Sequence, residues 1–216
     1  MKKAGEMWIL DEDAYFDKLF TKTKDQFEFY NLHLATQQVT NISCAIDVGA
    51  HYGSWTRFFS RMFKTVYAFE PHPKIFQCLE RNTEMMDNVT TVNSAIGDKE
   101  ENQRLIDGMI RKRNSGMSYL TDDGGPKNVS VKTIDSYKLK NVGLIKVDVE
   151  GYEYFAIRGA EETMLRCKPI IHFEDKWGER FGVEKEATTK YLQGLGASVL
   201  NTYEHANSKD YIMGWK

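Results

Sequence analysis

The chain has 216 residues, of which 41% are hydrophobic and 28% charged, with a formal net charge of −2. This composition is typical of a globular domain and excludes a disordered, collagenous or coiled-coil chain. No apolar run approaches the roughly 20 residues that span a bilayer, and Asp11 and Asp13 interrupt the first apolar stretch. We therefore expect a cytoplasmic protein without a signal peptide. The near-neutral charge offers no overall attraction to nucleic acid or to a membrane surface.

The three cysteines, Cys44, Cys78 and Cys167, follow no Cys-x-x-Cys or Cys/His spacing. A disulfide framework and a zinc site both need such a pattern or an even number of cysteines. The sequence therefore predicts three free thiols.

The first 41 residues are expected to form an N-terminal helical extension, and residues 42–216 the main domain. Between about residues 13 and 38, apolar residues recur at helical spacing, with a break near residues 21–24. These apolar residues are Phe16, Leu19, Phe20, Phe27, Tyr30 and Leu34.

From residue 44 onward, short apolar runs alternate with helical stretches, which is typical of a parallel sheet with helices on both faces. The predicted strands are 44–48, 65–69, 89–93, 144–149 and 169–173. The predicted helices are 55–63, 73–86, 154–166 and 184–195. Two further runs, 198–204 and 210–215, have no helix between them and predict a terminal antiparallel hairpin. Residues 99–131 are predicted to be an irregular insertion on the substrate side of the site.

The first strand runs into Asp47-Val-Gly-Ala-His-Tyr-Gly53, directly before a helix. Glycines let the backbone turn sharply and approach a ligand, and the helix N-terminus offers unpaired N–H groups. The Gly-x-x-x-Gly spacing lacks the tight pyrophosphate turn of Gly-x-Gly-x-x-Gly, so it suits a ligand with a carboxylate and a nucleoside. The alternative is a plain turn between strand and helix.

Two later turns fit the same nucleoside. Glu70 ends the second strand, where an acidic residue accepts hydrogen bonds from both ribose hydroxyls; the alternative is a turn acid before Pro71. The small residues after the third strand let an adenine lie against backbone, with Ser94 or Asp98 as hydrogen-bond partners. A simple turn is the alternative there.

Charged residues mark the ends of the fourth and fifth strands. Lys146, Asp148 and Glu150 share one face because side chains alternate along a strand, and unpaired buried charges are costly. They indicate an opening at the carboxyl ends, where α/β sheets bind ligands. The alternative is a Lys146–Asp148 structural pair with Glu150 starting the next helix. Glu174 and Asp175 on the adjacent strand should approach Asp148 and either hold a divalent cation or supply a base of raised pKa; solvated acids are the alternative.

In their joint order, these stretches resemble the FkbM family of class I S-adenosylmethionine-dependent methyltransferases. The resemblance covers roughly residues 44–176. The stretches that carry it are Asp47–Gly53, Tyr67-Ala-Phe-Glu-Pro-His-Pro73, Ala95-Ile-Gly-Asp98, Ile145-Lys-Val-Asp-Val-Glu-Gly-Tyr-Glu153, Gly159-Ala160 and Pro169-Ile-Ile-His-Phe-Glu174.

The resemblance implies a Rossmann-like α/β fold with seven strands in the order 3-2-1-4-5-7-6, the last antiparallel, and S-adenosylmethionine as cofactor. It places Asp47, Gly49, Ala50 and Gly53 around the methionine part of the cofactor, Glu70 at the ribose, and Ser94 and Ala95 near the adenine.

The resemblance also favours O-methylation of a hydroxyl on a sugar, glycan or small metabolite. Our mechanistic hypothesis puts Asp148 nearest the methyl group, beside Lys146, with Glu174 or Asp175 orienting or deprotonating the acceptor. Similar sugar O-methyltransferases place acids at these strand ends around magnesium, but a divalent metal is not expected here. His51 and His172 are alternative bases, although His172 fits a hydrogen-bonded core residue better.

Other functions stay open. Arg111, Lys112 and Arg113 could hold an anionic acceptor, or form a solvated basic loop. A nucleic-acid methyltransferase and a non-catalytic nucleoside-binding module are the alternatives in function; an NAD reductase is disfavoured because the dinucleotide fingerprint is absent. The sequence does not indicate the oligomeric state.

Overall fold

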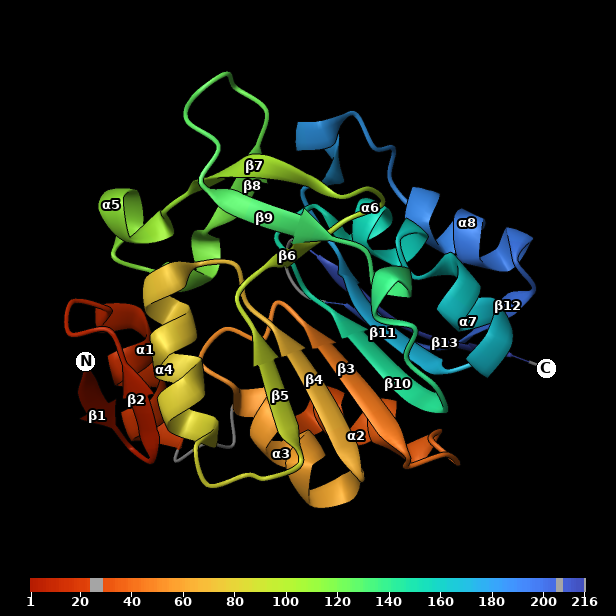
Figure 1. Ribbon diagram of the computed structural model, residues 1–216, viewed down its shortest axis with the longest axis horizontal. Coiled ribbons are helices and arrows are strands. Elements are labelled where there is room, and N and C mark those ends of the chain that lie inside the picture. Colours follow the sequence, from red (N-terminus) through yellow and green to blue (C-terminus); the bar gives the residue numbers. More distant parts are fainter. Residues whose placement is uncertain (24–28, 205–207, 216) are drawn as a thin grey trace.

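A computed structural model describes residues 1–23, 29–204 and 208–215, and a seven-stranded sheet lies at its centre (Figure 1). The strands are β3 (Cys44–Val48), β4 (Thr65–Phe69), β5 (Val89–Val92), β10 (Val142–Val147), β11 (Ile170–Asp175), β12 (Ala197–Glu204) and β13 (Lys209–Trp215). Their spatial order is β12-β13-β11-β10-β3-β4-β5, and β13 alone runs antiparallel to its neighbours. When these seven strands are numbered in chain order and read across the sheet from β5, this is the predicted order 3-2-1-4-5-7-6. The turn predicted between β12 and β13 falls mostly outside the described residues.

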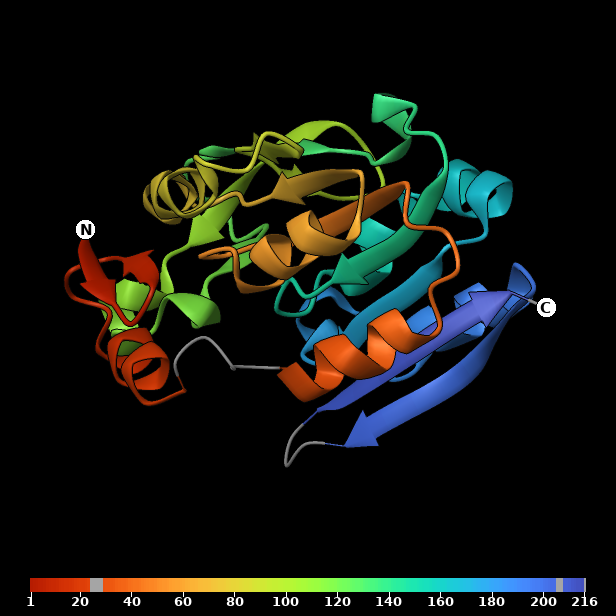
Figure 2. The same cartoon turned by 90° about the horizontal axis from the view of Figure 1, so that it is seen from below.

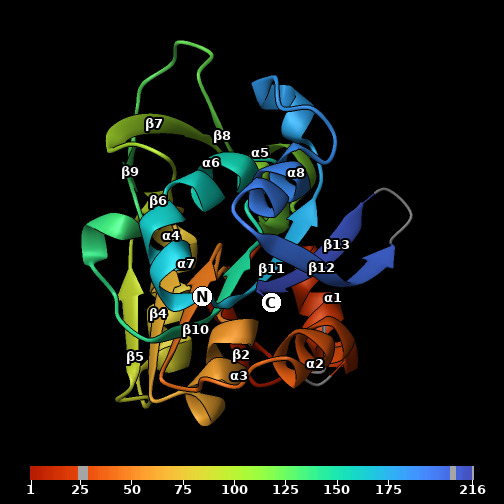
Figure 3. The same cartoon turned by 90° about the vertical axis from the view of Figure 1, so that its right-hand side faces the viewer.

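Helices cover both faces of this sheet, because its central strands are buried on both sides (Figure 3). One face carries α2 (Phe29–Gln37), α3 (Ser54–Met62) and α4 (Pro73–Thr83); the other carries α6 (Glu153–Arg158), α7 (Glu161–Cys167) and α8 (Ala187–Gly194). Alternate residues of β10 divide between the two faces: Leu144 packs with α2 and α3, and Ile145 with α6 and α7. Lys146 lies on the same face as Leu144, so its charge is on the side of the sheet that α2 and α3 cover.

Local signals explain most helix boundaries, but one predicted helix is divided. Pro73 opens α4, and the His72 ring caps it by accepting from the backbone N–H groups of Lys74 and Ile75 at 3.2 and 3.4 Å. The predicted helix 154–166 is instead two helices, α6 and α7. The chain turns at Gly159, where a Cβ atom would lie 1.9 Å from the carbonyl oxygen of Gly97, so this backbone contact replaces a continuous helix.

The N-terminal segment has the predicted helices, α1 (Ala14–Thr23) and α2, between residues 13 and 38, but it is not helical throughout. It begins with an antiparallel pair, β1 (Lys2–Ala4) and β2 (Met7–Ile9), before α1. Residues 24–28, where part of the predicted break falls, lie outside the description. Figure 2 shows β1, β2 and α1 beside α4, at the opposite end of the molecule from the C-terminus. Phe16 and Phe20 pack there against Tyr52 and Ile75.

The insertion predicted to be irregular forms a second sheet, in the order β6-β9-β7-β8. Its strands are β6 (Ala95–Ile96), β7 (Glu101–Ile106), β8 (Tyr119–Thr121) and β9 (Val129–Lys132), with α5 (Gly108–Lys112) and a 3₁₀ turn (Ser115–Met117) between β7 and β8. The sequence reading missed these strands because β6 and β8 are very short and β7 begins with four polar residues. Leu120, Val129 and Val131 form a small core with Tyr152, which holds the second sheet against the first.

Cys44, Cys78 and Cys167 are free thiols, as predicted. None of the helices in the described part of the chain is long and apolar enough to cross a membrane.

Candidate functional site

A cavity of about 370 Å³ opens at the carboxyl ends of β3, β4, β10 and β11. This volume lies within the range of small-molecule sites. Residues of α1 and of the second sheet line it from the other side. The predicted site residues that line it are Gly49, Ala50, Glu70, Ser94, Ala95, Lys146, Asp148 and Glu174.

Four predicted site residues, Asp47, Gly53, Asp98 and Asp175, do not line this cavity. Asp98 pairs with Arg158 at 3.4 Å and lines a separate surface pocket. Asp175 accepts a hydrogen bond from a backbone N–H at the start of α8, 3.1 Å away. Gly53 lies beneath the loop with φ +94°, where a Cβ would approach Leu79 to 2.8 Å.

The glycine loop depends on Gly49. Its φ is +76°, and a Cβ there would lie 1.9 Å from the carbonyl oxygen of Asp148. Only glycine combines this left-handed backbone with so close an approach. Gly49 thereby brings the loop after β3 directly against the end of β10.

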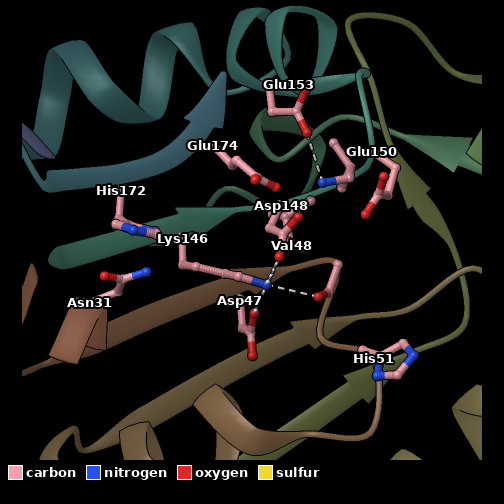
Figure 4. Close-up of polar contacts among 12 residues, drawn as sticks. Asn31, Asp47, Val48, His51, Lys146, Asp148, Glu150, Glu153, His172 and Glu174 are labelled. Atoms are coloured by element: carbon pink, nitrogen blue, oxygen red, sulfur yellow. Dashed lines mark hydrogen bonds and ion pairs between the residues drawn. The ribbon is translucent and has the colours of Figure 1, made fainter. Parts of the chain in front are cut away.

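Lys146 ties the same two elements together (Figure 4). Its Nζ donates to the carbonyl oxygen of Gly49 at 2.8 Å and pairs with Oδ1 of Asp47 at 3.2 Å. Asp148 is a more distant partner, at 3.9 Å. Asp47 is fully buried and also accepts from the hydroxyl of Thr56 at 2.6 Å. The Lys146–Asp47 pair is thus structural support under the loop, and the predicted Lys146–Asp148 pair is its weaker contact.

Glu70 is the acid whose surroundings best fit a nucleoside. It is buried, and its two oxygens each accept one backbone N–H, from His72 at 2.8 Å and from His51 at 2.9 Å. A carboxylate has about four acceptor positions, so further capacity remains for a ligand in the cavity. Burial raises the pKa of Glu70 to about 7. A pair of ribose hydroxyls would favour its ionised form.

Asp148, Glu150 and Glu174 form an acidic group in the cavity lining, where β10 and β11 end (Figure 4). The Lys176 Nζ lies 3.8 Å from Glu150 and 3.7 Å from Glu174. The pKa of Glu150 is raised to about 8, mainly by burial. The charge of Asp148 contributes more to this rise than the charge of Glu174 does. Burial and the charge of Asp148 also raise the pKa of Glu174. The predicted convergence of acids at these strand ends is therefore observed, with Glu150 in place of Asp175.

Glu153 fixes the turn that carries this acidic group, a role the sequence reading missed. Its Oε1 accepts from the backbone N–H groups of Val149 and Gly151 at 2.9 and 3.2 Å. Glu150 consequently adopts φ +55° instead of starting a helix. In the described residues, no three His, Cys, Asp or Glu side chains are grouped so that they could hold a metal ion.

The insertion lies over the cavity, as predicted: residues 114–120 line it. Tyr15 and Phe16 of α1 complete this cover. His51 lines the cavity too and contacts the hydroxyl of Ser115 through Nε2 at 2.7 Å. His172, by contrast, packs against Trp55 and pairs with Asp210 at 3.3 Å, and it does not line the cavity. Arg113 does not line the cavity either, and the side chains of Arg111 and Lys112 are not described.

Comparisons with known proteins identify the family and the fold. Residues 47–199 match the family described as "Methyltransferase FkbM domain". A curated relative, Methyltransferase 1 of Beauveria bassiana (strain ARSEF 2860), is 28% identical over 153 residues, which cover 56% of this chain and 59% of the relative.

Solved structures share the fold at low identity. The FkbM methyltransferase of Methylobacillus flagellatus superposes with a TM-score of 0.55 and 15% identity, over 97% of this chain and 56% of that one. A putative methyltransferase of Streptococcus mutans, solved in complex with SAH, gives 0.55 and 12%, over 86% and 96%. An rRNA methylase of Streptococcus thermophilus gives 0.55 and 11%, over 86% and 94%. The chain spans just over half the length of the Beauveria and Methylobacillus proteins.

Proposed function

Because this chain belongs to the FkbM methyltransferase family, we propose that it binds S-adenosylmethionine and transfers the methyl group to a hydroxyl of a sugar, glycan or small metabolite. The observation that carries the proposal is buried Glu70, presented to a cavity of nucleoside size by two backbone N–H groups. Among the described residues that line the cavity, no other acid accepts backbone hydrogen bonds from both the glycine loop and the N-cap of α4.

The residues of the cavity fit this cofactor in three parts. Glu70 would accept the ribose hydroxyls, and Ser94 and Ala95 would lie along the adenine. Gly49 and Ala50 would face the methionine part, while Asp47 and Gly53 support the loop from below. Asp98 would not reach the adenine, since it lines another pocket. When bound, the cofactor supplies an electrophilic methyl group on a sulfonium.

The acidic end of the cavity is the acceptor side in this proposal. Asp148 would lie nearest the methyl group, and Glu174 would orient the acceptor by accepting a hydrogen bond from a neighbouring hydroxyl. Asp175 is directed toward α8 and has no part in the site. Lys146 acts through the loop by holding Gly49 against β10. Positioning of a nucleophile in line with a methyl donor can supply roughly 7–11 kcal/mol of the barrier.

The charge of the acceptor side supports a small hydroxylated acceptor over a nucleic acid. Asp148 would repel a phosphate, and Lys176 already lies between Glu150 and Glu174, at 3.8 and 3.7 Å. Nucleic-acid binding depends largely on phosphate neutralisation and weakens steeply with salt. RNA binding that is strong at low salt and lost at high salt would contradict the proposed acceptor class.

The test is calorimetric titration of the wild type, Glu70→Ala and Glu80→Ala with S-adenosylmethionine and S-adenosylhomocysteine, and with NAD as a control ligand. Glu80 is an exposed acid of α4 and serves as the matched control. We expect binding of both sulfur nucleosides, weakened roughly 100-fold in Glu70→Ala, because hydrogen bonds to a charged group contribute about 1.5–3 kcal/mol each.

The pH dependence gives a second readout. Since the pKa of Glu70 is raised to about 7 and ribose hydroxyls donate to the ionised carboxylate, wild-type affinity should rise between pH 6 and pH 8. Equal affinity in wild type and Glu70→Ala, or binding of NAD alone, would overturn the cofactor assignment. Methyl uptake from labelled cofactor into sugar and polyol pools then tests the acceptor class.

A further inference from the structure

A buried polar chain joins the N-terminal segment, the inserted segment and the glycine loop. Asp13 is fully buried, and its Oδ2 accepts from the hydroxyl of Ser115, from the backbone N–H of Ser115 at 3.4 Å and from the hydroxyl of Tyr52 at 2.8 Å. The Ser115 hydroxyl also lies 2.7 Å from Nε2 of His51. These contacts have no part in the cofactor site described above, yet they end at a residue that lines the cavity.

Counting the protons of this chain assigns the tautomer of His51. Three donors converge on one oxygen of Asp13, which suits an ionised carboxylate that only accepts. The single hydroxyl proton of Ser115 is therefore directed to Asp13, and the Ser115 oxygen is left to accept from His51. Nε2 of His51 must then carry the proton, and in a neutral imidazole Nδ1 keeps a free lone pair.

The surroundings of His51 keep the ring neutral and fixed. Burial lowers its pKa to about 3, helped by the charges of Lys146 and His72. The ring packs against Phe16 and Tyr52, with centroids 4.4 and 4.1 Å away. Its backbone N–H is held by Glu70. Within the part of the chain that the structure describes, no protein group bonds to Nδ1, so this atom is available to a ligand in the cavity.

We propose that His51 is a catalytic residue whose Nδ1 accepts the proton of the acceptor hydroxyl, and that Asp13 and Ser115 are positioning residues that keep Nδ1 free to do so. The inference rests on the proposed function. It assigns a role in the reaction to both the N-terminal segment and the insertion. Asp13 comes from the first and Ser115 from the second, and together they form the hydrogen-bonded contacts that end at His51.

The step balances with the groups present. As the oxygen–methyl bond forms, the sulfur–methyl bond breaks and sulfur keeps its electron pair, so the acceptor oxygen gains positive charge. Its proton thereby becomes strongly acidic, and a weak base such as His51 can take it. The imidazolium that results donates from Nε2 to Ser115, and the negative charge of Asp13 lies directly behind. Glu150 and Glu174 suit this role less well, because their raised pKa values favour protonated forms.

The first test is ¹⁵N NMR of the full chain labelled in histidine, with the His51 signals assigned by their loss in His51→Gln. We expect a neutral ring protonated on Nε2 from pH 5 to pH 8 in the wild type. Ser115→Ala removes the acceptor for this proton, so it should shift the ring toward a mixture of tautomers. A proton on Nδ1, titration near the ordinary histidine pKa, or identical spectra in wild type and Ser115→Ala would overturn the assignment.

The second test asks whether Nδ1 meets a hydroxyl. With S-adenosylhomocysteine present, glycerol is titrated as a hydroxyl donor and its fully O-methylated form as a matched compound without donors. We expect the Nδ1 resonance to move toward lower chemical shift with glycerol only. Equal responses, or none, would overturn the role of His51 while leaving the proposed function intact. Failure of S-adenosylhomocysteine to bind the wild type in calorimetry would instead refute the proposed function itself.

Discussion

The cavity has a floor and a cover that are built in different ways. The floor, formed by the loop 49–53, Glu70 and the end of β10, belongs to the buried seven-stranded sheet and is joined by backbone contacts and the Lys146–Asp47 pair. The cover, residues 1–23 and 99–131, packs on the main domain through two small cores. Proteins open locally where few buried contacts hold a region. Changes in the floor should therefore unfold the whole domain, and changes in the cover should cost less.

Gly49→Ala is the change in the floor with the largest expected effect. The new Cβ would meet the carbonyl oxygen of Asp148 at 1.9 Å, in a backbone with φ +76°. Since neither backbone segment can move without disrupting the sheet, we expect a loss of more than about 3 kcal/mol in the free energy of unfolding. Urea denaturation followed by circular dichroism measures it.

Gly124→Ala in the cover is the matched control. Its φ of +81° is similar, but a Cβ there would meet nothing within 4 Å. The left-handed backbone alone should cost about 1–2 kcal/mol. If both variants lost the same stability, the close approach of Gly49 to β10 would not be what holds the floor together.

The floor was largely predictable from sequence because its signals are local. A glycine loop after a buried strand, Glu70 at the next strand end and the alternation of Lys146, Asp148 and Glu150 all follow from neighbours in the chain. Two predicted site residues have side chains that turn away from the cavity. Asp98 and Asp175 lie at the expected ends of strands, but they contact Arg158 and the start of α8 instead. Sequence spacing places a residue at a strand end without fixing the orientation of its side chain once the strand has ended.

The insertion was predicted on the substrate side of the site, but the contacts of the cover were not predictable, because they join distant parts of the chain. Asp13 and Ser115 are 102 residues apart, and neither stands in a motif. Phe16 was assigned to a helix correctly, yet nothing in its spacing indicated that the ring packs on His51. Short strands such as Tyr119–Thr121 gain their stability from Tyr152 of the main domain, so the insertion read as irregular.

Glu150→Gln should change stability in a pH-dependent way at the edge of the floor. The pKa of Glu150 is raised from 4.5 to about 8 in the folded chain, so its contribution to stability is fully present below pH 4.5 and is lost as the pH rises through 8. Glutamine carries no charge, so the variant should gain on the wild type between pH 5 and pH 9. We expect an advantage on the order of 1–3 kcal/mol at pH 9.

Urea denaturation at pH 5, 7 and 9 measures this gain, with Glu100→Gln as the control because Glu100 is half exposed and pairs with Lys132 on the surface. A gain that stays constant with pH would mean that neither burial nor the charge of Asp148 raises the pKa of Glu150 in the folded protein.

Asp17→Asn in the cover should have the smallest effect. Asp17 pairs with Lys2 at 2.7 Å, but both side chains are more than a third exposed, and exposed pairs contribute about 0–1 kcal/mol. The same change at buried Asp13 leaves Ser115 and Tyr52 competing for a weaker acceptor, so it should cost at least about 1 kcal/mol. Thermal melts of the two variants compare like substitutions within one segment. A loss at Asp17 as large as that at Asp13 would mean that surface charge attaches the cover, whereas a loss confined to Asp13 would show that the buried polar chain does.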